Sequence, residues 1–184
     1  MDNGASSYRR FREGDDDGLI QIIRTYRDGL TLYLFSLTGD VTLAEELAED
    51  TFVLLGTKKP RDKGTGSFKT WLYTIGRNLA INALRKRSRS REVPLDACAA
   101  LSDETLLETA HLRQQQKRTV HRAIGHLKAE YRQILWLVYF EGFSHKEAAA
   151  IMGKSVHSIE MLAHRARKAL KSQLEKEGFV YEEL

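Results

Sequence analysis

A two-helix pattern near the C-terminal end of the chain constrains its fold more than any other feature. Ser144 is followed three residues later by Glu147, which is the capping-box spacing that begins a helix. Gly153 supplies the left-handed residue that commonly ends a helix, and Ser155 is a suitable N-cap for the next one. Two helices joined by a short turn with glycine form a helix-turn-helix. An ordinary helical hairpin has similar spacing, so the pattern alone leaves both structures open.

The second helix of this pair, expected over 156–175, divides into two faces at about 100° per residue. Its small and aliphatic side chains share one face and are predicted to be core. In a DNA-bound helix-turn-helix the opposite, polar face contacts base edges, and flanking basic residues contact phosphates. Two histidines on that face could also bind a metal ion, but no further ligand is spaced to complete a site. The residues predicted to contact duplex DNA are Ser155, His157, Ser158, Glu160, Met161, His164, Arg165 and Lys168.

Helical periodicity also dominates the rest of the chain, and no segment alternates convincingly at period two. We predict helices over 16–37, 42–58 and 68–87. The second of these is expected to begin at a capping box formed by Thr42 and Glu45. The fold class is therefore all-α.

The stretch 88–101 contains Pro94 and small residues and lacks a helical period, so it is predicted to be a flexible linker. Ser102 is a plausible N-cap for the helical sequence that follows it. We therefore expect two small helical domains, the first over 1–87 and the second, with the helix-turn-helix, over 102–184.

The composition favours a protein of the cytoplasm. Cys98 is the only cysteine, which excludes an intramolecular disulfide and a zinc site built from several cysteines. The first eighteen residues are polar and lack the apolar run of a signal peptide, and no apolar stretch approaches the ~20 residues that span a bilayer. We expect no membrane insertion, no metal and no cofactor.

Charge is distributed unevenly, although the formal net charge is only +4. Five bases and no acid occur over 85–91, whereas four acids and no base occur over 42–51. These acids lie opposite the apolar face of their predicted helix. A solvated helix face would look the same, but an acidic face beside a basic DNA-binding region suggests a basic protein partner. The four acids are Glu45, Glu46, Glu49 and Asp50.

The predicted helix 68–87 has a polar ridge suited to unpaired nucleic acid. Trp71, Asn78 and Arg85 lie seven residues apart, with Asn82 close by and Lys86 at the start of the basic run. Aromatic rings stack on unpaired bases, amides reach exposed base edges, and basic residues hold phosphates. Core packing is an equally good prediction for Trp71 itself.

Three runs of this sequence resemble extracytoplasmic-function (ECF) sigma factors of bacterial RNA polymerase. Their core-polymerase-binding helix resembles the run 43–52, LAEELAEDTF, and their helix for the downstream (−10) promoter element resembles 68–86, FKTWLYTIGRNLAINALRK. Their domain for the upstream (−35) element resembles 131–150, YRQILWLVYFEGFSHKEAAA, and continues through GKSV at 153–156 and HRARKAL at 164–170.

The resemblance implies a role for each region. The acidic face would bind the polymerase core enzyme, and the segment 59–67, with Lys63, would capture a flipped base of the −10 element. The ridge from Trp71 to Lys86 would hold the melted strand, and the helix-turn-helix would bind the −35 element as duplex. The implied function is promoter recognition, DNA melting and transcription initiation without catalytic residues. Family members are often held inactive by an anti-sigma factor, which is a further candidate partner. His157, Glu160 and Met161 depart from the small or basic residues common on the recognition face, which leaves the −35 sequence open.

Two other classes of protein fit less well. A stand-alone helix-turn-helix regulator would carry a ligand or receiver domain, and a receiver would alternate strands with helices, which this sequence does not. A helical di-iron enzyme needs two Glu-x-x-His pairs and two more carboxylates, and only Glu108 and His111 form such a pair.

Overall fold

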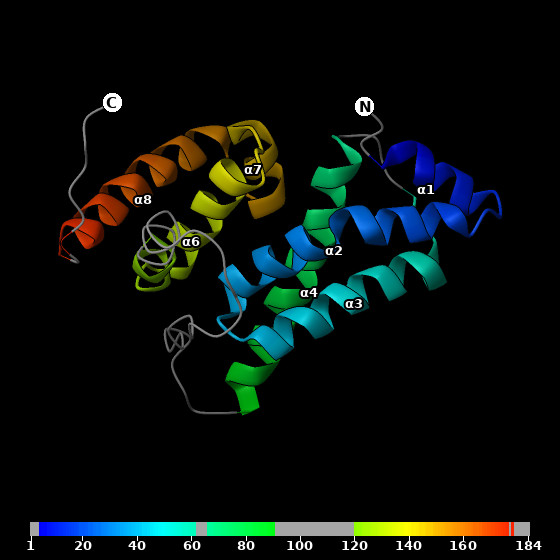
Figure 1. The fold of residues 1–184 in the computed structure, drawn as a ribbon, viewed down its shortest axis with the longest axis horizontal. Coiled ribbons are helices and arrows are strands. Elements are labelled where there is room, and N and C mark those ends of the chain that lie inside the picture. The colour runs from blue at the N-terminus through cyan, green and yellow to red at the C-terminus, as the bar shows by residue number, and fades with distance from the viewer. Residues whose placement is uncertain (1–3, 62–65, 91–119, 177, 179–184) are drawn as a thin grey trace, which may run out of the picture.

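The computed structural model describes residues 4–61, 66–90, 120–176 and 178. Every regular element in these ranges is helical, as predicted (Figure 1). Residues 91–119 contain most of the predicted linker, Cys98, Ser102 and the Glu108–His111 pair, and they lie outside the described residues, as does Lys63. The predicted domain boundaries therefore stay a prediction.

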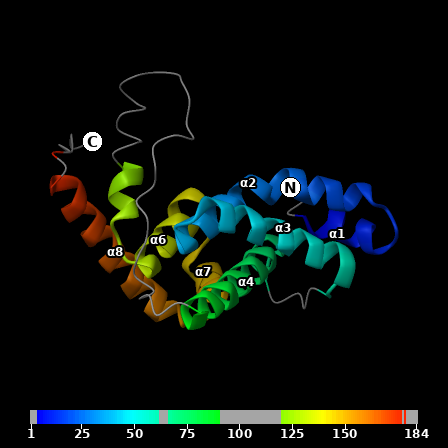
Figure 2. The same ribbon diagram turned by 90° about the horizontal axis from the view of Figure 1, so that it is seen from below.

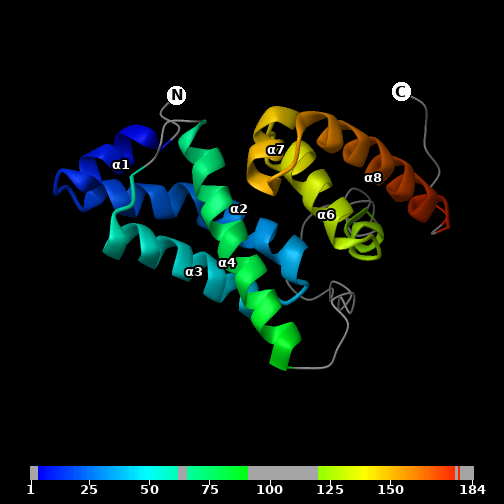
Figure 3. The same ribbon diagram turned by 180° about the vertical axis from the view of Figure 1, so that it is seen from behind.

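Three long helices build the N-terminal half: α2 (Asp17–Thr38), α3 (Val41–Lys58) and α4 (Phe68–Ser90). The sequence predicted each of them to within about three residues. Helix α4 crosses both α2 and α3, which is clearest from behind (Figure 3). Gly76 suits this close crossing, because a Cβ atom there would lie 3.0 Å from the Leu30 side chain, which would have to shift.

A short helix that the sequence did not predict, α1 (Ala5–Arg12), precedes them. Its sequence is polar and rich in arginine, so its two aromatic residues are the only strong apolar signal. Both of them, Tyr8 and Phe11, are buried against the rest of the N-terminal half. Burial of this one face, rather than intrinsic propensity, accounts for a helix this short.

The predicted capping box at the start of α3 is wrong. The N-cap is Asp40, whose carboxylate accepts a hydrogen bond of 3.1 Å from the backbone N–H of Leu43. The Arg87 guanidinium donates a second hydrogen bond of 2.9 Å to Asp40 from the far end of α4. The bond from Arg87, followed by the one from Leu43, lowers the pKa of Asp40 below its usual value. Asp40 is favoured over Thr42 as the N-cap because its carboxylate also pairs with the Arg87 guanidinium.

The C-terminal half comprises a helical segment at 120–125, then α6 (Ala129–Leu135), the π-helical turn η2 (Trp136–Phe140), α7 (His145–Met152) and α8 (Val156–Lys176). The capping box at α7 is confirmed, since the Ser144 hydroxyl accepts from the Glu147 N–H and the Glu147 carboxylate accepts from the Ser144 N–H. Gly153 ends α7 at φ 64°, and Ser155 caps α8 through the N–H of Ser158.

The two halves pack against each other around one continuous core. Helix α2 contacts α6, and α4 contacts α7, as two perpendicular views agree (Figures 1 and 2). Between the halves, the buried Arg132 guanidinium donates a hydrogen bond of 2.8 Å to the carbonyl of Ser36, near the C-terminal end of α2. It donates a second hydrogen bond, of 2.7 Å, to the carbonyl of Leu127 in its own half. A cation at a helix C-terminus is favoured by the helix dipole.

Replacing Asp40 tests the observed cap. Asp40→Ala removes both the cap and the Arg87 pair, and we expect it to lower the free energy of unfolding by about 1 kcal/mol. Asp40→Asn keeps a capping oxygen and loses only the charge pair, so its cost should be smaller, about 0.5 kcal/mol. Because the folded pKa of Asp40 is depressed, this smaller difference should disappear as the pH falls below 3.8. Denaturant unfolding at neutral and acidic pH measures it, and equal stability of all three proteins would contradict the assignment.

Candidate nucleic-acid and protein interfaces

Helix α8 presents the predicted duplex-binding face to solvent. The side chains that periodicity assigned to the core, including Ile159, Leu162 and Ala166, are buried against the preceding helices. Six of the predicted contact residues are exposed on the other side: His157, Glu160, Met161, His164, Arg165 and Lys168. Ser155 and Ser158 are also exposed, but their hydroxyls bond each other at 2.8 Å as part of the α8 cap. Their predicted DNA role would therefore compete with capping.

Helix α4 presents the predicted single-strand ridge, with one qualification. Four of its residues are exposed along the second half of the helix: Asn78, Asn82, Arg85 and Lys86. Trp71 is only half-buried, and its ring lies 5.3 Å from that of Tyr8 and 5.6 Å from that of Phe68. Trp71 thus both packs on the core and offers part of its ring to solvent, so the two predictions made for it are compatible.

The acidic face of α3 is exposed in full. Glu45, Glu46, Glu49 and Asp50 all point away from the buried Ala44, Leu47 and Ala48. Among the residues that the structure describes, the one basic partner of these acids is Arg27, at 4.0 Å from Glu49, in a pair that is itself well exposed. Such a pair contributes little stability. The face is therefore accessible to a basic partner.

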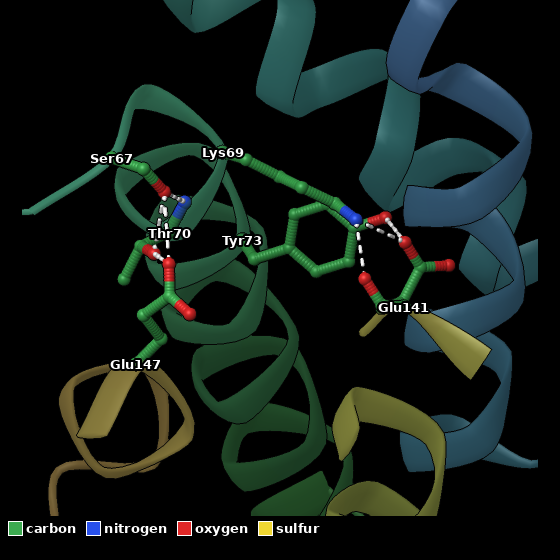
Figure 4. Close-up of polar contacts among 6 residues, drawn as sticks. All are labelled: Ser67, Lys69, Thr70, Tyr73, Glu141 and Glu147. Atoms are coloured by element: carbon green, nitrogen blue, oxygen red, sulfur yellow. Dashed lines mark hydrogen bonds and ion pairs between the residues drawn. The ribbon is translucent and has the colours of Figure 1, made fainter. Parts of the chain in front are cut away.

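A further group of polar residues joins the two halves (Figure 4), and of its members the sequence singled out only Glu147, as a capping residue. We call it the interdomain cluster, and it consists of Ser67, Lys69, Thr70 and Tyr73 from the start of α4 with Glu141 and Glu147 from the C-terminal half.

Glu141 is the centre of the interdomain cluster. Its carboxylate accepts a hydrogen bond of 2.7 Å from the Tyr73 hydroxyl and lies 3.0 Å from the Lys69 ammonium. The same ammonium also donates a hydrogen bond of 2.8 Å to the backbone carbonyl of Glu141. The Glu141 side chain is only 13% exposed. Burial first, and then the adjacent Glu141 charge, raises the pKa of Tyr73, so the phenol stays protonated and donates. An ion pair this sheltered is stabilising only because its other polar atoms are hydrogen-bonded.

Glu147 forms the other side of the cluster while capping its own helix. Its carboxylate lies 3.3 Å from the Thr70 hydroxyl and 3.4 Å from the Ser67 hydroxyl. Burial opposes ionisation, but the hydrogen bonds from Ser144, Thr70 and Ser67 together outweigh it and lower the pKa of Glu147. The cap of α7 is thereby attached to the first turn of α4.

Aromatic and cation contacts add to the junction between the two halves. The ring of Tyr73 meets that of Phe143 edge-on at 5.0 Å, and the Lys69 ammonium lies 4.7 Å from the centre of the Phe143 ring. Farther along α4, the Arg77 guanidinium donates 3.2 Å to the side chain of Gln133. Lys69, Tyr73 and Arg77 follow one another at intervals of four residues, so this spacing was the available sequence signal for a third polar face of α4.

Comparison with known proteins connects both halves to one family. Residues 22–90 match the family model of sigma-70 region 2, and residues 117–170 match that of sigma-70 region 4. The chain is 30% identical over 167 residues to the RNA polymerase sigma factor YlaC of Bacillus subtilis, covering 87% of this chain and 94% of the relative. It is 32% identical over 149 residues to the ECF RNA polymerase sigma factor EcfG of Rhodopseudomonas palustris, covering 81% of each.

The chain belongs to the ECF sigma factors of RNA polymerase. The predicted resemblance is therefore confirmed, and promoter recognition by RNA polymerase is the function of this family. ECF sigma factors are transcription initiation factors rather than enzymes.

The fold agrees with this assignment. The structure superimposes on the sigma factor RpoE of Bartonella quintana, solved with the anti-sigma factor NepR, at a TM-score of 0.69 and 27% identity, covering 84% of this chain and 95% of that one. The fold of CnrH is also similar, at a TM-score of 0.63. Among the residues that the structure describes, none of the helices combines the length and apolar character needed to cross a bilayer.

Removing the Glu141 carboxylate should separate the two halves of this sigma factor. In Glu141→Ala the Lys69 ammonium and the Tyr73 hydroxyl lose their common partner inside the contact, at a cost of about 2 kcal/mol to docking. We expect a larger radius of gyration in small-angle X-ray scattering, with unchanged helix content.

Glu130→Ala is the matched control, because Glu130 pairs with Lys154 at 3.0 Å within the C-terminal half and is more than half exposed. Its radius of gyration should equal that of the wild type. An equally compact Glu141→Ala protein would show that the interdomain cluster does not hold the halves together.

Proposed function

We propose that the protein binds RNA polymerase core enzyme through the acidic face of α3 and places α4 on the −10 element and α8 on the −35 element. The observation that supports this most directly is the separation of three exposed surfaces of different chemistry on a chain that matches both sigma-70 regions. Each surface lies on a different helix, so one molecule can use all three at once.

The acidic face suits a basic protein surface. Its four carboxylates project from successive turns of α3 above a buried apolar side, which keeps them in fixed relative positions. Complementary charge of this kind increases the rate of association and selects the partner. The core-binding residues of this proposal are Glu45, Glu46, Glu49 and Asp50.

The exposed parts of α4 and α8 suit two forms of DNA. On α4, asparagine and basic side chains follow the partly exposed ring of Trp71 along the helix. This arrangement suits stacking and phosphate contacts with an unpaired strand. On α8, the contact residues lie toward the N-terminal end of the second helix of a helix-turn-helix, the part that enters the major groove. Lys63 belongs to the −10 surface in this proposal, and it lies outside the described residues.

The proposal extends to mechanism and location. The protein would contribute no catalytic group of its own, since the polymerase carries out the chemistry, and it would act in the cytoplasm. An anti-sigma factor is a candidate regulatory partner, which is supported by the RpoE structure solved with NepR.

The two halves must separate for this proposed function. Elements at −35 and −10 lie about 25 base pairs apart, or about 85 Å of duplex. A compact chain of 184 residues has a radius of gyration of about 16 Å, so it is only about 40 Å across. The intervening segment 91–119 is long enough to span the difference, because an extended chain covers about 3.3 Å per residue.

Charge reversal on α3 tests the core-binding surface. The double variant Glu46→Lys with Asp50→Lys should lose co-elution with RNA polymerase core enzyme on a sizing column, by at least about tenfold in affinity, because it places two cations against a basic partner. Its circular dichroism should match the wild type, since both side chains are exposed.

The control is Glu13→Lys with Glu175→Lys, which changes the net charge equally at two exposed positions outside α3. This control should co-elute as the wild type does. Core binding by the α3 variant, or equal loss in both variants, would refute the assigned surface.

Opening of the interdomain cluster should also affect promoter binding. Glu141→Ala weakens a contact that must break, so the holoenzyme containing it should bind a full promoter with about thirtyfold higher affinity than the wild type, because about 2 kcal/mol of docking energy no longer has to be lost. Affinity of the free protein for a duplex with only the −35 element should not change. Fluorescence anisotropy with the two DNAs separates these effects, and equal promoter affinity would contradict a closed state that precedes binding.

A further inference from the structure

Helix α1 contacts the residues just after α3 and the first turn of α4, and it precedes the residues that match sigma-70 region 2. It is firmly attached to α2. The Ser7 hydroxyl donates a hydrogen bond of 2.9 Å to the Gln21 side chain. The two helices also approach so closely that a Cβ atom at Gly18 would collide with the carbonyl oxygen of Ser7. Helix α1 can therefore serve as a fixed support for what it contacts next.

One side chain of α1 contacts both Pro60, which follows α3, and the first turn of α4. The Tyr8 hydroxyl donates a hydrogen bond of 2.6 Å to the carbonyl of Pro60, close after the end of α3. The Tyr8 ring lies 5.5 Å from that of Phe68, the first residue of α4, and 5.3 Å from that of Trp71. Tyr8 is only 4% exposed, so these contacts define its position.

The adjacent residues hold the same junction. Lys59 ends α3 in the left-handed conformation, at φ 43°, which turns the chain toward α1. Its ammonium then lies 4.4 Å from the centre of the Phe11 ring. At the other end, a Cβ atom at Gly4 would lie 2.5 Å from the Phe68 ring, so α1 begins in direct contact with the start of α4.

We propose that Tyr8 is a positioning residue for −10 recognition: it fixes Pro60, just after α3, relative to Phe68 and to the ring of Trp71. This inference rests on the proposed function of α4. Tyr8 itself is buried and need not touch DNA. A hydrogen bond to a backbone carbonyl at one end and ring contacts at the other set the spacing between the two sides of the −10 surface.

Tyr8→Phe removes the hydroxyl and keeps the ring. The matched control is Tyr33→Phe, because the Tyr33 side chain is also buried and its hydroxyl has no hydrogen-bond partner among the described residues. The two variants thus make the same chemical change, and they differ in whether a hydrogen bond is lost.

The readout is base preference rather than affinity. Holoenzyme assembled from polymerase core enzyme and each full-length protein selects from a promoter DNA library randomised at the −10 and −35 elements, and the bound DNA is sequenced. We expect Tyr8→Phe to lower the preference for the selected −10 bases by about fivefold, the effect of one ordinary hydrogen bond. The −35 preference should stay as in the wild type, and Tyr33→Phe should keep both preferences.

Each other outcome has one meaning. An unchanged −10 preference in Tyr8→Phe overturns the inference, and so does an equal loss at both elements, because a general folding defect would affect both. If the wild type itself shows no preference at −10 while it selects at −35, the proposed role of α4 fails, and the role of Tyr8 fails with it. The wild-type selection therefore distinguishes the two failures.

Discussion

The contact of Glu141 with Lys69 and Tyr73 determines how the two halves of this sigma factor fit together. Apolar surfaces alone would allow α4 and the C-terminal helices to slide past each other, because hydrophobic burial has no direction. A sheltered carboxylate has one favourable position, in which the ammonium and the phenol both reach it. Polar groups inside a contact therefore fix its register even where they add little net stability. Arg132 fixes the second contact, between α6 and the end of α2, in the same way.

Helix α4 carries three tasks because its residues fall on three separate faces. Phe68 and Leu72 face the core of the N-terminal half, and Gly76 permits the close crossing over α2 and α3. The face with Lys69, Tyr73 and Arg77 meets the C-terminal half. The remaining face, from Asn78 to Lys86, stays exposed. Because successive side chains on an α-helix are about 100° apart, these faces stay separate, and the interdomain cluster leaves the proposed −10 ridge uncovered.

How much of this could be predicted from the sequence depends on how far apart the interacting residues lie along the chain. The capping box at Ser144 and the turn at Gly153 are local, and both were predicted correctly. The cap at Asp40 was missed because its second partner, Arg87, is 47 residues away. Helix α1 was missed because its stability comes from burial of Tyr8 and Phe11 against distant elements. The cluster around Glu141 was missed for the same reason, since 68 residues separate it from Tyr73. The exposure of the residues proposed for DNA and polymerase could be predicted, because amphipathic and charge patterns are properties of single helices.

The polar character of the interdomain contact also suits a state that has to open. When an apolar contact separates, its surface meets water at a cost of about 25 cal/mol per Å². When Lys69 and Glu141 separate, both charges regain hydration, which offsets much of the lost attraction. A net docking energy of about 3 kcal/mol would leave the halves open in roughly 1% of molecules, and that fraction would lower the apparent promoter affinity by the same factor. Since α3, α4 and α8 each keep their own exposed surface in the closed form, opening requires no rearrangement within either half. The cost of promoter binding would then be set by the contacts between the halves rather than by refolding of any site.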